Sequence, residues 1–203
     1  MQRGLSVVGG FFVRAILWLV PALALWFWAR DWVVAPVAWL VERAMLFWFS
    51  VWVYGTELAG TEQTLLTTVQ VPHPSGRAAE LLVDTNVLMY CYGLPMLLAL
   101  LLASRAHGIW WKLPAGALAM WPLQAWGVVF DFLIQIGAHH ARFSTPITGF
   151  TPFQVDLFGV AYQLGYLVLP TLAPVMLWLL FERRFIGMVM FDAALDGATR
   201  SRR

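Results

Sequence analysis

The sequence predicts an all-α polytopic membrane protein of about five transmembrane helices with a small extracytoplasmic β-hairpin. Of its 203 residues, 61% are hydrophobic and only 12% are charged, whereas water-soluble domains are about half hydrophobic and about a quarter charged. The apolar residues also gather into runs of about 20, the length that crosses a bilayer as a helix. Many of the 12 tryptophans lie near the ends of these runs, as expected for an interfacial aromatic belt.

The apolar runs define the predicted spans. These are residues 5–29, 32–54, 86–104, 113–137 and 157–181. The first run is too long for the apolar core of a cleaved signal peptide, so we expect it to remain as a helix. Because Glu42 and Arg43 interrupt the second run, an interfacial helix over 32–43 is an alternative there. We expect one integral membrane domain over residues 1–203.

Basic residues in short connections predict the orientation of the spans. Arginines in the tail, residues 182–203, and in the 105–112 loop predict that both lie in the cytoplasm. The 61–84 hairpin then faces the outside, and an odd number of spans places the N-terminus outside as well. The net charge of +2 does not indicate a nucleic-acid surface, so membrane lipids are the expected surroundings.

Residues 61–84 carry the pattern of a β-hairpin. Apolar and polar side chains alternate on both sides of a turn that contains Pro72, Pro74 and Gly76. Such a hairpin would offer a partner a strand edge and an apolar face; the alternative is a plain loop. The residues of this candidate partner-binding face are Val69, Val71, Leu81 and Val83.

Polar side chains inside the predicted spans form a candidate intramembrane seam. Its members are Glu42, Arg43, Gln124, Asp131, Gln135 and Gln163. A charge in the hydrocarbon needs a partner, so we expect an interhelical pair between Arg43 and Asp131. A seam that holds helices together is the leading interpretation. A groove for an extended peptide and a proton relay are the alternatives.

Residues 84–93, DTNVLMYCYG, follow the hairpin directly and place Cys91 at a helix entry. This arrangement resembles the exosortases, which are membrane cysteine transpeptidases. The resemblance implies an arginine on the next span and a histidine on the one after. Residues 121–131 (WPLQAWGVVFD) contain no arginine, and residues 153–165 (FQVDLFGVAYQLG) contain no histidine. A thiol needs such partners to become a nucleophile, so we expect Cys91 to be inert.

Three segments carry a second resemblance: YGLPMLLALLLAS, PLQAWGVVFDFL and YQLGYLVLPTLAPVMLWLL. They are similar to the exosortase H-associated membrane protein family, which implies a setting in bacterial protein sorting. The leading hypothesis is a non-catalytic accessory in the inner membrane, which binds the sorting enzyme or the C-terminal membrane segment of its substrate.

Two rival functions remain open at this point. One is a cysteine transpeptidase or protease whose base is His139 or His140, and the other is a small proton-coupled transporter. The two histidines are adjacent and lack neighbouring ligands in sequence, so no metal or other cofactor is expected.

Overall fold

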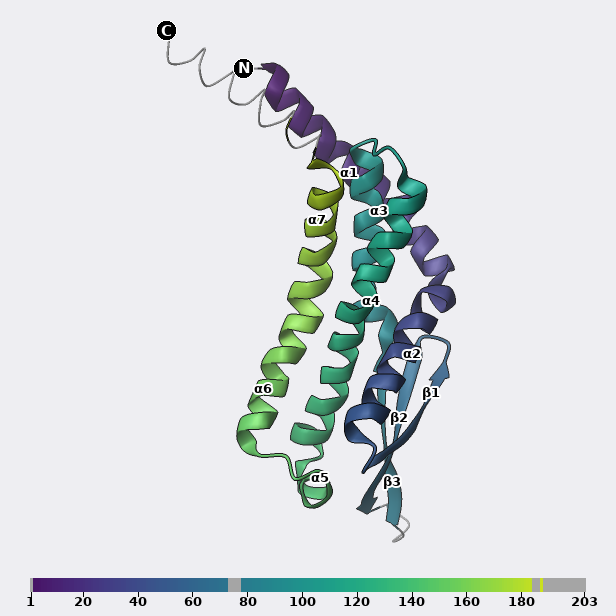
Figure 1. Cartoon of the computed structure of the whole chain (residues 1–203), viewed down its shortest axis with the longest axis vertical. Coiled ribbons are helices and arrows are strands. Elements are labelled where there is room, and N and C mark those ends of the chain that lie inside the picture. Colours follow the sequence, from purple (N-terminus) through teal and green to yellow (C-terminus); the bar gives the residue numbers. More distant parts are fainter. Residues whose placement is uncertain (1, 73–77, 184–186, 188–203) are drawn as a thin grey trace. The chain divides into compact units, whose positions relative to one another are not determined.

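The computed structural model describes residues 2–72, 78–183 and 187, with side chains described from residue 9 onward. Most of the described chain is helical, and one antiparallel sheet interrupts the helices (Figure 1). In chain order the elements are α1 (Gln2–Trp28), α2 (Arg30–Phe49), β1 (Val53–Ala59), β2 (Glu62–Pro72), β3 (Ala78–Asn86), the 3-10 helix η1 (Val87–Tyr90), α3 (Gly93–Ala103), α4 (Ile109–Ile134), the π-helix η2 (Gln135–His139), α5 (Ala141–Thr148), α6 (Pro152–Gln163), the π-helix η3 (Leu164–Val168) and α7 (Leu169–Phe181).

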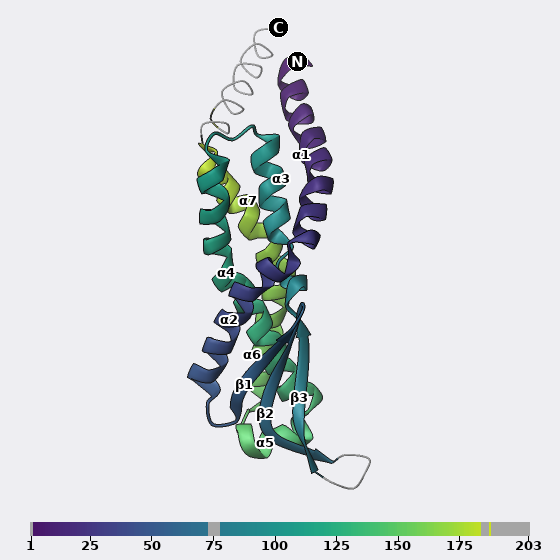
Figure 2. The same ribbon diagram turned by 90° about the vertical axis from the view of Figure 1, so that its right-hand side faces the viewer.

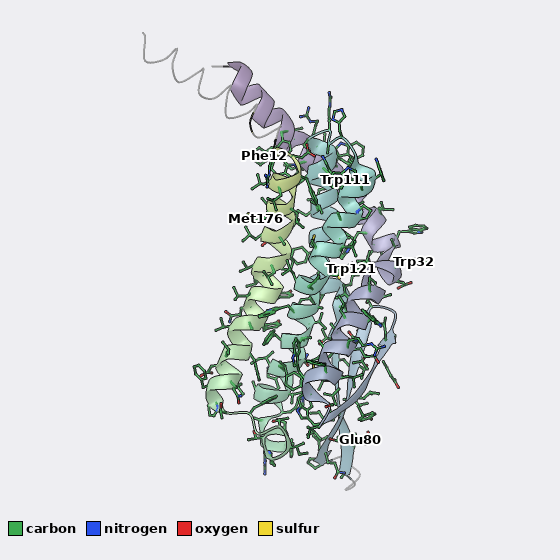
Figure 3. All side chains as sticks on the ribbon, viewed as in Figure 1. Phe12, Trp32, Glu80, Trp111, Trp121 and Met176 are labelled. Carbon is green, nitrogen blue, oxygen red and sulfur yellow. The ribbon has the colours of Figure 1, made fainter. Side chains whose placement is uncertain are left out.

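Within the described residues, 4 helical segments are long and apolar enough to cross a bilayer. They are Gly9–Trp28, Arg30–Phe49, Ile109–His139 and Pro152–Phe181. Helices long enough to cross a membrane are therefore found in four of the five predicted spans, although the last two extend beyond the predicted bounds. Large apolar side chains on these helices point outward, including Trp32 and Met176 (Figure 3). Such an outer surface suits contact with lipid rather than water.

The predicted span 86–104 is wrong as a single membrane-crossing helix. Its first residue ends β3, and the helix α3 has only 11 residues. At 1.5 Å per residue α3 is about 16 Å long, roughly half of the hydrocarbon thickness. The Asn86 side chain accepts a hydrogen bond from the Leu88 nitrogen, which caps η1, and Pro95 lies in the first turn of α3. These local features break the apolar run into separate elements.

The predicted second span, 32–54, also ends earlier than expected. Helix α2 stops at Phe49, and Val53 begins a third strand that the hairpin prediction did not include. The sheet has the order β1-β2-β3 and is antiparallel throughout. Gly60, with a φ of +63°, provides the tight turn between β1 and β2. The predicted turn between β2 and β3 lies at residues outside the described part.

The chain folds into two compact units. The first contains the described residues of Met1–Trp28, Gly93–Leu118 and Thr171–Arg203. Within it, α1 lies along α3 (Figure 2). Arg14 of α1 donates from its Nε to the carbonyl oxygen of Ala103 at 3.1 Å. The predicted cytoplasmic tail, 182–203, lies outside the described residues except at 182, 183 and 187.

Contacts from α4 and α7 complete the first unit. The Trp178 indole donates to the Ser104 hydroxyl at 3.2 Å, just after the end of α3. Lys112, near the start of α4, forms a largely buried ion pair with Glu182, which follows α7. Long side chains from separate helices therefore satisfy polar groups at the end of α3 and the start of α4.

The second unit contains Ala29–Tyr92 and Ala119–Pro170. Here α2 packs on the sheet (Figure 2). Gln63 of β2 is 1% exposed, and its Nε2 donates to the Ala38 carbonyl oxygen of α2 and to Thr56 Oγ1, both at 3.0 Å. No hydrogen bond in the described structure reaches Gln63 Oε1. The amide thus ties a sheet residue to the backbone of a helix.

Helix α5 was not expected from the sequence. It also contacts β2 of the second unit, and it ends at Gly149, which has a φ of +67°. Ser144 is fully buried and donates to the Ile136 carbonyl oxygen at 2.8 Å. Because residue 136 lies in η2, this bond fixes α5 against the π-helix that precedes it.

Candidate functional site

Cys91 lies between η1 and α3 and is fully buried. Its Sγ donates to the carbonyl oxygen of Val87 at 3.4 Å, and its backbone nitrogen donates to the Leu88 carbonyl oxygen at 3.0 Å. Within the described residues, no histidine, arginine or carboxylate forms a hydrogen bond with the thiol. The thiol is therefore packed as a small buried side chain, and its one hydrogen bond among the described residues goes to a backbone carbonyl oxygen.

A polar junction joins the end of β3 to α4 in the second unit. The Thr85 hydroxyl donates to Asp131 Oδ2 at 2.8 Å, and the Gln135 Nε2 donates to the Thr85 Oγ1 at 3.1 Å. The same Nε2 lies 3.3 Å from the carbonyl oxygen of Asp84, to which it also donates. Asp131 and Gln135 are one helical turn apart, so both face the strand. Thr85 thus sits between two helix side chains.

A group of tyrosines borders this junction. Four of the chain's five tyrosines belong to it, namely Tyr90, Tyr92, Tyr162 and Tyr166. Tyr162 and Tyr166 stack with ring centroids 5.8 Å apart, and Tyr90 meets Tyr166 edge to face at 5.7 Å. The side chain of Tyr90 also interacts with Asp131. The sequence places Tyr162 and Tyr166 four residues apart in one helical segment. It does not show that they contact Tyr90 and Tyr92.

Two glycines bring α4 and η3 into backbone contact. A Cβ built on Gly165 would lie 2.5 Å from the Gly127 Cα, and one built on Gly127 would lie 2.4 Å from the Tyr90 ring. Only residues without a side chain fit such a crossing. Gly165 lies within a π-helix, a local widening that often occurs at functional sites. The crossing therefore fixes the tyrosines beside Asp131.

The structure brings together only part of the predicted seam. Asp131 and Gln135 meet through Thr85, whereas Gln124 is buried elsewhere on α4 and Gln163 is exposed. The predicted pair between Arg43 and Asp131 is wrong. Arg43 is exposed and lies over the Trp39 ring, 5.6 Å from its centroid, while Glu42 is half-buried. The Asp131 carboxylate accepts a hydrogen bond from Thr85 and interacts with the side chains of Tyr90 and Gln135. It therefore has partners other than the guanidinium of Arg43.

The predicted apolar face of the hairpin is turned inward. Val69, Leu81 and Val83 are each at most 5% exposed, and Val71 is half-buried. These residues pack inside the second unit, so the apolar face that the sequence suggested for a partner is not exposed in the described structure. The opposite face of the sheet is the one that solvent or a partner can reach.

The outer face of the sheet is acidic. The three strands contain Glu57, Glu62, Glu80 and Asp84, all exposed, and no lysine or arginine. Glu80 lies on this outer side (Figure 3), where its Oε2 accepts a hydrogen bond from the Tyr54 hydroxyl at 2.6 Å. This bond to the carboxylate raises the pKa of Tyr54 above its ordinary value. Asp84 is similarly held, because its Oδ1 accepts from the Thr64 hydroxyl at 2.6 Å.

Comparison with known families gives a match over most of the chain. Residues 5–185 match the family described as exosortase H-associated membrane protein. No curated protein and no solved structure matches the chain. The resemblance in the three sequence segments is thereby confirmed, and the helical spans agree with a membrane protein. The chain therefore belongs to the exosortase H-associated membrane protein family, whose name implies an association with exosortase H.

Proposed function

We propose that this protein is a non-catalytic accessory of an exosortase-type sorting system in the bacterial inner membrane. It binds the sorting enzyme or the C-terminal membrane segment of a sorted substrate. The observation that carries the proposal is the state of Cys91, which is buried and whose thiol donates to the carbonyl oxygen of Val87. Membership of the family provides the sorting context.

The arrangement around Cys91 argues against a transpeptidase. Covalent catalysis by cysteine requires an accessible thiolate and a base that takes its proton. His139 is exposed on η2, and neither it nor His140 forms a hydrogen bond with Cys91 in the described structure. The described residues thus have an exosortase-like order of strand, cysteine and helix in which the Cys91 thiol is not accessible to a substrate.

Two kinds of surface are suited to binding. The outer sheet face must lie outside the hydrocarbon, because open sheet edges cannot face lipid. The helices present apolar side chains that lipid or the membrane segment of another protein would cover, and most of the residues of Gly9–Trp28 are not buried in the described structure. An accessory that contacts both an enzyme and a membrane-anchored substrate needs surfaces of these two kinds.

The positive residues support an orientation with the sheet in the periplasm. Arg105 and Lys112 lie in or beside the turn between α3 and α4, which favours the cytoplasm for that turn. A reporter inserted after Gly60, an exposed turn residue, should be active as a periplasmic phosphatase. A cytoplasmic signal at that position would reverse the proposed orientation.

Photo-crosslinking in native membranes tests the accessory role. A photoreactive amino acid is placed at Leu82, 53% exposed on the sheet, or at Leu172, 51% exposed on α7. We expect crosslinks from Leu82 to an exosortase or its substrate, and recovery of the same protein with the unmodified chain. If neither an exosortase nor a substrate is recovered, the accessory role is wrong. Crosslinks from Leu172 alone would place the contact on the helices.

A further inference from the structure

The β3 strand is an open edge of the sheet. It pairs with β2 along one side, and no other strand pairs with it in the described chain (Figure 2). Its exposed residues alternate with buried ones, and Leu82 is 53% exposed. An open edge presents unpaired main-chain donors and acceptors, which can pair with an added strand.

The direction of the free groups follows from two hydrogen bonds. The Leu81 carbonyl oxygen accepts from the Thr67 hydroxyl of β2, so it points into the sheet. The Asp84 carbonyl oxygen accepts from Gln135 of η2, so it points out of the sheet. Because antiparallel residues alternate in direction, the main-chain groups of Glu80 and Leu82 also point outward. The described structure gives these two residues no partner on that side, whereas the Asp84 carbonyl oxygen is already bonded to Gln135 of η2.

The side chains beside this edge alternate in character. Glu80, Leu82 and Asp84 share the outer face, so an apolar residue stands between two carboxylates. Hydrogen bonds from Tyr54 and Thr64 hold the carboxylates in place. Neighbouring strands interact through directly opposed side chains, and opposite charges at such positions are favourable.

We propose that the β3 edge binds an extended basic segment of a partner protein as a fourth strand. The segment would alternate a basic, an apolar and a basic residue at every second position, opposite Glu80, Leu82 and Asp84. This inference rests on the proposed accessory function and specifies the chemistry of its partner. Main-chain hydrogen bonds to Glu80 and Leu82 supply the attachment, and the two carboxylates select for positive charge.

The same geometry disfavours a second copy of this chain on the edge. Pairing of two β3 strands would bring Glu80 and Asp84 of one copy close to those of the other. Like charges on neighbouring strands are destabilising. The absence of lysine and arginine from all three strands means that nothing in the sheet would offset that repulsion.

The probe is a short fluorescent peptide in which every second residue is threonine. The residues between the threonines are lysine, valine and lysine in that order. Its binding to the full-length protein in detergent is measured by fluorescence anisotropy. We expect saturable binding that weakens as salt is raised. A peptide with glutamate in place of lysine, and one N-methylated at alternate backbone nitrogens, should both fail to bind. Equal binding of either control peptide, or no binding of the probe at about 1 mM, overturns the proposal.

Variants locate the binding on β3. Glu80→Gln with Asp84→Asn keeps both hydrogen-bond acceptors and should weaken binding by roughly threefold to tenfold. Leu82→Pro removes an outward N–H, which an edge strand tolerates, and should abolish binding. Glu57→Gln, on the outer face of β1, is the matched control and should change nothing. If Glu57→Gln weakens binding as much as the β3 variants, the β3 assignment is wrong.

Recovery of an exosortase is measured in parallel and separates the two proposals. Recovery that persists with the wild-type chain while the peptide does not bind removes the edge proposal and leaves the accessory role. Failure of recovery despite peptide binding removes the accessory role and leaves the edge.

Discussion

Arg14 of α1 donates from its Nε to the carbonyl oxygen of Ala103, the last residue of α3, at 3.1 Å. The final carbonyl groups of a helix lack intrahelical donors, and a positive charge is favourable at that end. An arginine that interrupts an apolar span therefore completes the terminus of a neighbouring short helix.

Replacing this arginine should destabilise the first unit. We expect Arg14→Met to lower the free energy of unfolding by about 1.5–3 kcal/mol, the range for a hydrogen bond to a charged group. Thermal unfolding in detergent measures the effect. Arg43→Met is the matched control, since Arg43 is exposed on α2. Equal losses in the two variants would show that the Ala103 contact contributes nothing specific.

Thr85 and Asp131 should behave as a coupled pair. We expect Thr85→Val and Asp131→Asn to interact by about 0.5–3 kcal/mol in a double-mutant cycle, because their side chains share one hydrogen bond. Asp131→Asn with Arg43→Gln should be additive within about 0.5 kcal/mol. Coupling in the second cycle alone would restore the ion pair that the sequence suggested.

The glycine crossing in the second unit should not tolerate even a methyl group. In Gly165→Ala the new Cβ would lie 2.5 Å from the Gly127 Cα, and a backbone atom cannot move aside cheaply. We expect a loss of about 1–3 kcal/mol in unfolding free energy. Gly159→Ala on α6 meets only Ile134 at 3.7 Å and should be neutral or stabilising by up to about 1 kcal/mol.

Cys91 should be unreactive in the folded protein. Because it is fully buried, iodoacetamide should label it only after denaturation, whereas Thr68→Cys on the outer sheet face should label readily. Cys91→Ser retains a donor for the Val87 carbonyl oxygen and should leave substrate sorting unchanged. Loss of sorting at normal protein levels would support a catalytic role instead.

The bond between Tyr54 and Glu80 should be visible at alkaline pH. The raised pKa of Tyr54 means that the unfolded chain loses this proton first, so the contribution of the bond is complete below the ordinary tyrosine pKa near 10 and disappears as pH rises through the folded value. Subtracting the ultraviolet titration curve of Tyr54→Phe from that of the wild type isolates the absorbance of Tyr54. This difference should show the Tyr54 phenolate forming at a pH above the ordinary tyrosine pKa. Glu80→Gln should shift the transition downward, and an unchanged transition would argue against the bond.

Four of the helices were predictable because an apolar run of about 20 residues suits a membrane crossing. The run 86–104 was not, because Asn86 caps a 3-10 helix and α3 begins only at Gly93. The third strand was missed because Val53–Ala59 follows an apolar helix closely and shows its character only by pairing with β2. The partner of Asp131 could not be found either. Thr85 lies 46 residues away, on a strand, and no periodicity links the two positions. The Arg14 contact spans 89 residues and depends on where α3 ends.

The buried amide of Gln63 affects the register in which the sheet packs on α2. Neighbouring strand residues point to opposite faces, so a shift of β2 by one position would turn this side chain outward and direct Glu62 or Thr64 toward Ala38. Glu62 would then place a carboxylate against a carbonyl oxygen, and Thr64 would lose its bond to Asp84. Many apolar residues of this chain could replace one another in such a contact. The single buried amide of Gln63 therefore determines the register in which β2 packs on α2.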